Sequence, residues 1–134
     1  MAAKPFDWPD FLTLAEELAA RPEEHCLRTA IGRAYYYAYH LARQRVVDNE
    51  FVITKFEDSH KQVWEKFNNS PEYSCKKLYD LAKILKDKRQ QADYNSIFPR
   101  IEDEFPGIIT TAKKFAADLN ALDKRLPVNR GVRA

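Results

Sequence analysis

The chain has 134 residues, enough for one domain, and its 45% hydrophobic and 31% charged residues exclude a disordered protein. With 22 basic and 20 acidic residues the net charge is +2, so bulk charge does not drive nucleic-acid binding, although a local basic site still can. Three glycines are too few for a phosphate-binding loop, and the Walker and Rossmann motifs are absent from the sequence.

The cysteine, histidine and hydrophobic patterns argue against disulfide-rich, metal-binding and membrane-spanning proteins. Two cysteines and three scattered histidines, without CxxC or HExxH spacing, predict neither a disulfide framework nor a metal site, and we expect no cofactor. No apolar run approaches the ~20 residues that a membrane-spanning helix needs. The first nine residues lack the apolar stretch of a signal peptide, so we expect a cytoplasmic protein without membrane contact.

Apolar residues recur at helical spacing along nearly the whole chain. The first predicted helix begins at Asp7-Trp8-Pro9, where Asp7 can cap it and proline suits the first turn, and it ends before Pro22. Its apolar stripe consists of Phe11, Leu14, Ala15 and Leu18. The second helix runs from about residue 22 to about residue 47. Its stripe consists of Leu27, Ala30, Ile31, Ala34, Ala38, Leu41 and Ala42.

Residues 48–57 form a connection, and a third helix starts at Asp58-Ser59. Ser70-Pro71 ends that helix and caps a fourth, whose stripe is Leu78, Leu81, Ala82 and Leu85. Pro99 and Pro106 then bound an irregular piece, and a last helix carries apolar residues from Ile108 to Leu122. The prediction is an all-α, up-and-down bundle of four to five helices, with one domain at 1–126 and a flexible tail at 127–134.

The second predicted helix has a polar and aromatic side in addition to its apolar stripe. Arg33 and His40 are seven residues apart, hence within ~20° of each other and about 10 Å apart along the axis, with Tyr36 and Tyr37 between them. Under one interpretation the tyrosines pack against a neighbouring helix or a second subunit. Under the other, arginine holds a phosphate, tyrosines stack on bases and histidine transfers protons, which indicates an RNA or nucleotide site.

Three segments resemble the prokaryotic HEPN domain family, in order and spacing. Arg33-Ala-Tyr-Tyr-Tyr-Ala-Tyr-His40 resembles the family's Arg-Ala-Tyr-Tyr-x-x-x-His helix. Ser59-His60-Lys-Gln-Val63, followed by Phe67, is similar to its Ser/Thr-His-x-x-Val…Phe segment. Arg89-Gln-Gln-Ala-Asp-Tyr94 is similar to its Arg-x-x-Ala-Asp-Tyr segment before the last long helix. The resemblance as a whole covers about residues 10 to 123, with these three segments at its centre.

The resemblance implies a helical bundle that forms homodimers. Many HEPN proteins are metal-independent endoribonucleases with an Arg-x(4–6)-His signature, often toxins or defence effectors. It thus implies that Arg33 and His40 are catalytic, that RNA is the substrate and that a cognate antitoxin exists. In the better-understood nucleases this pair lies at the start of the last long helix. Either the pair has moved to the second helix here, or the chain is a non-catalytic module that binds a nucleotide or a partner such as a nucleotidyltransferase.

The third segment supplies further candidate binding residues. Arg89 and Asp93 are four residues apart, so they can form an ion pair on a helix surface, or they can orient Arg33 or a bound phosphate. Tyr94 is a third candidate for binding substrate or nucleotide, although its residue type favours packing. His60 lies in the first turn of its helix, where a structural role is favoured.

Overall fold

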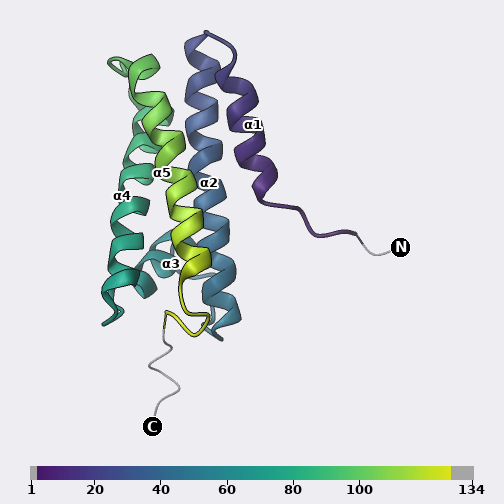
Figure 1. Cartoon of the computed structure of the whole chain (residues 1–134), viewed down its shortest axis with the longest axis vertical. Coiled ribbons are helices and arrows are strands. Elements are labelled where there is room, and N and C mark those ends of the chain that lie inside the picture. The colour runs from purple at the N-terminus through teal and green to yellow at the C-terminus, as the bar shows by residue number, and fades with distance from the viewer. Residues whose placement is uncertain (1–2, 128–134) are drawn as a thin grey trace.

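The computed structural model describes residues 3–127, and this part of the chain forms five α-helices, which confirms the all-α prediction. They are α1 (Pro9–Ala19), α2 (Glu24–Asp48), α3 (Ser59–Asn68), α4 (Tyr73–Tyr94) and α5 (Ile101–Ala121). In Figure 1 the four longer helices lie lengthwise side by side and alternate in direction along the chain. The short α3 packs at the end of the bundle where α2 finishes. No described helix is long and apolar enough to span a membrane.

Helix α2 is the central helix, because it packs against α1, α3, α4 and α5. Small residues make this possible: an i, i+4 row of fully buried alanines lets neighbouring helices approach closely. The row consists of Ala30, Ala34, Ala38 and Ala42. Three tyrosines of α2 are buried as well, so the helix is covered on several sides rather than along one stripe. These tyrosines are Tyr35, Tyr37 and Tyr39.

Two arginines of α2 hold the C-terminal ends of the helices beside it. Arg28 Nη1 donates to the carbonyl oxygens of Ala92 (2.9 Å) and Asn95 (2.6 Å) at the end of α4. Arg45 Nη2 donates to the carbonyl oxygen of Leu119 (2.8 Å) near the end of α5. Carbonyl groups in a helix's last turn lack partners in the helix and carry its negative partial charge, so a guanidinium stabilises them.

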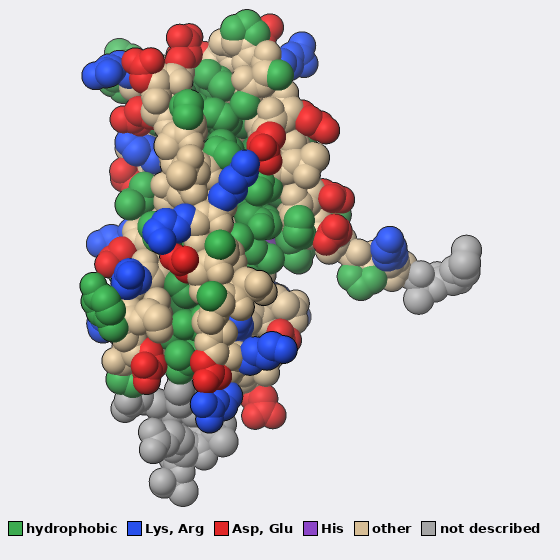
Figure 2. All heavy atoms as spheres, in the orientation of Figure 1, with side chains coloured by type: hydrophobic (Ala, Val, Ile, Leu, Met, Phe, Trp, Pro, Cys, Tyr) green, Lys and Arg blue, Asp and Glu red, His purple; other side chains and the backbone are tan. Residues whose placement is uncertain are grey.

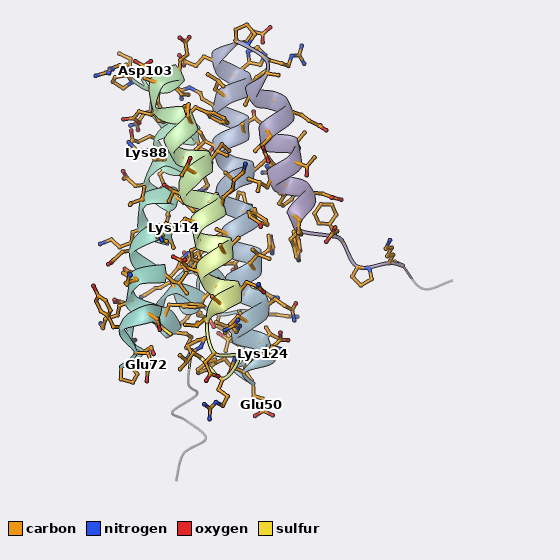
Figure 3. All side chains as sticks on the ribbon, viewed as in Figure 1. Glu50, Glu72, Lys88, Asp103, Lys114 and Lys124 are labelled. Atoms are coloured by element: carbon orange, nitrogen blue, oxygen red, sulfur yellow. The ribbon has the colours of Figure 1, made fainter. Side chains whose placement is uncertain are left out.

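An ion pair joins the C-terminal part of α4 to the start of α5. Lys88 Nζ lies 2.8 Å from a carboxylate oxygen of Glu104, in the first turn of α5. Figure 3 shows Lys88 and Asp103 toward the same end of the bundle. Because Glu104 is near the helix N-terminus, its charge also interacts favourably with the helix dipole.

Two predictions about α1 are wrong. The N-cap position belongs to Trp8, and neither Trp8 nor Asp7 caps the helix through its side chain. Leu14 is exposed, whereas Leu12, which was not assigned to the stripe, packs against the core. The reason is the rotation of α1 about its axis, which is set by packing against α2 and not by the apolar residues of α1 alone.

Predicted boundaries of the later helices are shifted. The last helix starts at Ile101, so Pro106 lies inside it and does not precede it. A proline near the start of a helix removes one backbone hydrogen bond, and Phe105 and Ile108 on either side of it are buried and hold the turn in place. The Ser70 side chain accepts a hydrogen bond from the Glu72 backbone N–H, while Glu72 occupies the N-cap position of α4. Residues 128–134 of the predicted tail lie outside the described residues.

Candidate functional site

Arg33, Tyr36 and His40 face the same neighbours on one side of α2. The Arg33 guanidinium carbon lies 5.2 Å from the centre of the Tyr36 ring and 4.8 Å from that of Phe11, on α1. The His40 ring centre is 6.4 Å from Tyr36 and 6.3 Å from Phe11. The structure therefore places Arg33 and His40 around the same two aromatic rings, as their spacing of seven residues predicts.

The N-terminal end of α1 covers one face of His40. The Trp8 indole lies parallel to the His40 ring, with 3.5 Å between centroids and 3° between planes. Neither ring nitrogen of His40 has a hydrogen-bond partner among residues 3–127, and neither is buried. The edge of the imidazole is therefore free to exchange protons while its face is held by the indole.

His40 is neutral at pH 7 for two reasons. Burial is the larger and lowers its pKa from the ordinary value of 6.5, because an apolar environment disfavours the charged ring. Positive charge nearby acts in the same direction, from Arg43 first, then His60 and Arg33. The neutral ring can accept a proton through its free nitrogen.

Helix α4 brings a second guanidinium to Tyr36. The Arg89 guanidinium carbon lies 5.2 Å from the centre of the Tyr35 ring and 5.6 Å from that of Tyr36. The ion pair with Asp93, one of the two roles that their spacing allows, is present at 3.2 Å. Arg89 Nε is buried and has no hydrogen-bond partner in the described part of the chain. Arg89 therefore belongs both to a helix-surface ion pair and to the site around Tyr36.

Two candidate residues lie away from this site. Tyr37 is buried on the side of α2 that faces α5, where it lines a cavity of about 350 Å³ with Leu41, Ala116 and Leu119. Burial raises its pKa. Tyr36 and Tyr37 are ~100° apart on the helix, so different helices cover them, and the prediction that both lie between Arg33 and His40 is wrong for Tyr37. Tyr94 is exposed and makes no ring contact or hydrogen bond with other described residues.

His60, at the start of α3, joins the site and was not assigned to it from the sequence. Its ring is stacked on Tyr39 at 3.9 Å and lies 5.8 Å from Tyr36. Its Nδ1 is 2.7 Å from the Tyr35 hydroxyl, and the oxygen of that hydroxyl accepts a hydrogen bond from Trp64 Nε1 at 3.0 Å. The sequence signal for this placement is the Ser-His-x-x-Val segment itself, whose histidine reaches α2 only because α3 folds back against it.

We call Arg33, Tyr36, His40, His60 and Arg89 the Arg–His cluster. It combines side chains from α2, α3 and α4, with α1 covering it. Over the face in Figure 2 acidic and basic side chains are interspersed, whereas the cluster holds two guanidiniums with one paired carboxylate. No carboxylate of residues 3–127 lies within 4.0 Å of the Arg33 guanidinium. The cluster therefore favours an anion.

A cavity of about 490 Å³ between α3 and α4 lies next to the Arg–His cluster. Trp64 and Lys86 line it, and both also act on cluster residues: Trp64 through the Tyr35 hydroxyl and Lys86 through its charge near His60. Its other basic side chains are Lys61 and Lys83. Glu65 and Asp87 line it too, and Lys61 of α3 is paired with Glu65, so the cavity has mixed charge with an excess of one lysine.

A metal ion has no evident site here. Within residues 3–127 no three His, Cys, Asp or Glu side chains lie close enough together to hold one. The chemistry available to the Arg–His cluster is anion binding by the guanidiniums, base stacking on the aromatic rings and proton transfer by His40.

We expect Trp8→Ala to raise the pKa of His40 toward 6.5, because burial is the largest cause of its lowering. Since the folded pKa lies below the unfolded one, His40 contributes stability above pH 6.5 that decreases as the pH falls toward the folded pKa. NMR titration of the His40 ring protons measures the change. Phe6→Ala is the matched control, because Phe6 contacts Trp8 and Phe11 but not His40. A pKa that stays unchanged in Trp8→Ala would contradict the explanation.

Comparison of the chain with protein-family models, with curated proteins and with solved structures gives no match.

Proposed function

We propose that this chain is a HEPN-like domain that binds RNA through the Arg–His cluster and cleaves it without a metal ion. The observation that carries the proposal is the convergence of Arg33 and Arg89 on the Tyr36 ring, next to His40 with its free ring nitrogens. The Arg33…His40 spacing adds the resemblance to the HEPN ribonuclease signature. In keeping with that resemblance, the proposal includes a homodimer and a toxin or defence role.

Arg33 is the primary phosphate ligand in this proposal. Its guanidinium lies against two aromatic rings, which leaves its N–H groups without a carboxylate partner among residues 3–127. A planar guanidinium can hold two phosphate oxygens at once, which fixes the phosphodiester beside the helix. The rings of Tyr36 and Phe11, already oriented against Arg33, offer surfaces for an unpaired base.

His40 is the general base in this proposal. The neutral imidazole takes the proton of a ribose 2′-hydroxyl, and the 2′-oxygen attacks the adjacent phosphorus. The bond from phosphorus to the 5′-oxygen breaks, and water supplies the proton that the leaving oxygen needs. Arg33 stabilises the extra negative charge on the phosphate oxygens in the transition state. The products are a 2′,3′-cyclic phosphate end and a 5′-hydroxyl end.

The proposal is tested by incubating the purified protein with a mixed-sequence RNA in the presence of a chelator. We expect cleavage to continue without divalent ions, and the products to carry 2′,3′-cyclic phosphate ends, identified by mass spectrometry. Binding to the same RNA is measured in parallel. Binding without cleavage would contradict the nuclease and favour the alternative, a non-catalytic module that recognises a nucleotide or a partner protein through the same cluster.

A further inference from the structure

The Trp64–Tyr35–His60 chain of hydrogen bonds has only one consistent direction. An indole N–H can only donate, so the Tyr35 oxygen accepts from Trp64 Nε1. Burial raises the pKa of Tyr35 to about 12, so its hydroxyl keeps its own proton. That proton has His60 Nδ1 as its acceptor, at 2.7 Å. Neutral His60 therefore carries its hydrogen on Nε2.

The His60 ring is also held in place from other sides. It is stacked on Tyr39, whose hydroxyl donates to the Ser59 hydroxyl at 2.9 Å. The backbone N–H of His60 donates to the Asp58 carboxylate, the N-cap of α3. The ring orientation is thus determined by contacts with α2 and by the start of its own helix, and Nε2 points in a set direction.

Protonation of His60 is disfavoured by this arrangement. A second proton would have to sit on Nδ1 and donate to the Tyr35 oxygen, which would leave the Tyr35 hydroxyl hydrogen without its acceptor. Among the charges near the ring, Asp58 at the N-cap of α3 raises the pKa of His60 most, while Arg89 and Lys86 of α4 lower it. Burial, the largest cause, also lowers its pKa.

His60 Nε2 is the free end of this chain. It has no hydrogen-bond partner among the described residues and is not buried, so it can donate to a ligand. The same ring lies 5.8 Å from Tyr36, on which both cluster arginines pack. Arg89 brings a positive charge beside it, together with a buried Nε that lacks a partner among residues 3–127.

We propose that His60, with its hydrogen on Nε2, binds a phosphate oxygen of RNA through that N–H beside Arg89, and takes no part in proton transfer. The inference rests on the proposed function and gives the two histidines different tasks. His40, with free nitrogens, exchanges protons; His60, with Nδ1 bound to Tyr35, positions a second phosphate of the strand.

The first test compares His60→Gln with His60→Ala. The glutamine amide N–H can take the place of Nε2–H, but it cannot exchange protons near neutral pH. The probe is a 2′-O-methyl oligoribonucleotide of mixed sequence, which cannot be cleaved by 2′-hydroxyl attack. We expect His60→Ala to weaken binding at least about tenfold, since hydrogen bonds to charged groups are worth that much, and His60→Gln to restore most of it.

The second test determines the His60 tautomer directly by ¹⁵N NMR of the imidazole nitrogens. In the wild-type protein we expect the hydrogen on Nε2. In Tyr35→Phe we expect a mixture of tautomers and a higher pKa of His60. Tyr39→Phe is the matched control, because it keeps the stacked ring and removes a hydroxyl that bonds Ser59 rather than His60. The wild-type spectrum decides the tautomer even if Tyr35→Phe does not fold.

Several results would overturn the inference: hydrogen on Nδ1 in the wild-type protein, unchanged RNA binding in folded His60→Ala, or equal losses in His60→Ala and His60→Gln. Its failure is distinguishable from failure of the proposed function. If His60→Ala cleaves RNA normally, the proposed function stands and the inference about His60 is overturned. If the wild-type protein does not cleave RNA but its binding depends on His60 as described, the nuclease proposal is overturned and the inference about His60 stands.

Discussion

Replacing His40 with alanine is expected to lower the rate of RNA cleavage by about 10²- to 10⁴-fold, the usual contribution of a positioned general base. The loss follows because His40 has two free ring nitrogens, whereas Nδ1 of His60 is bound to Tyr35. RNA affinity is expected to change little, because the phosphate ligands remain. Rates are measured under single-turnover conditions without divalent ions, and circular dichroism checks that the variant is folded.

The matched control for this experiment is His25→Ala. His25 is an exposed histidine on the same helix, 15 residues or ~22 Å along the axis from His40. The His25→Ala substitution should leave the rate of RNA cleavage unchanged. Cleavage that persists in His40→Ala at the wild-type rate would show that the nucleolytic site lies elsewhere or that the activity is a contaminant.

The pH dependence of cleavage follows from the same role. The base acts only when neutral, so the rate should fall as the pH decreases through the pKa of His40. Because burial lowers that pKa, the acid limb lies below pH 6.5, and Trp8→Ala should move it upward.

Replacing Arg33 with methionine is expected to have the second-largest effect, lowering cleavage by about 10²- to 10³-fold, comparable to the removal of one oxyanion ligand elsewhere. In contrast to His40→Ala, RNA binding should also weaken, because the guanidinium holds the phosphate before and during the reaction. Methionine keeps a long apolar side chain against Phe11, so packing on α1 is largely preserved.

Arg21→Met serves as the control for charge. Arg21 lies between α1 and α2, at the opposite end of α1 from Trp8, and its side chain is exposed. The Arg21→Met substitution removes the same charge without changing the Arg–His cluster. It should therefore lower RNA affinity only by the small, salt-dependent amount that any lost surface charge contributes. If Arg21→Met and Arg33→Met weaken binding equally, the contribution of Arg33 is long-range charge and not a direct phosphate contact.

The sequence alone predicted the helices well because helical periodicity is a local property. The start of α3 at Asp58-Ser59 was predicted from residue types, and in the structure the helix begins at Ser59 with Asp58 as its N-cap. Pro106 was misjudged, since a proline near a helix start can either end or join the helix, and the burial of Phe105 and Ile108 decides which. For the same reason Leu14 was assigned to the buried stripe of α1 in place of Leu12: the side of α1 that becomes buried depends on how it packs against α2.

Within the site, sequence spacing alone determined what belongs to one helix. It placed Arg33 and His40 on a shared side of α2, and it allowed an Arg89–Asp93 ion pair as one of two roles, because both follow from 3.6 residues per turn. The tertiary structure decided what no single helix contains. The contact of Arg89 with Tyr36, the stacking of Trp8 on His40 and the hydrogen bond from Tyr35 to His60 each join side chains from two helices. Such contacts depend on how helices rotate and approach each other, which is decided by packing of the whole core and leaves no periodic trace in the sequence.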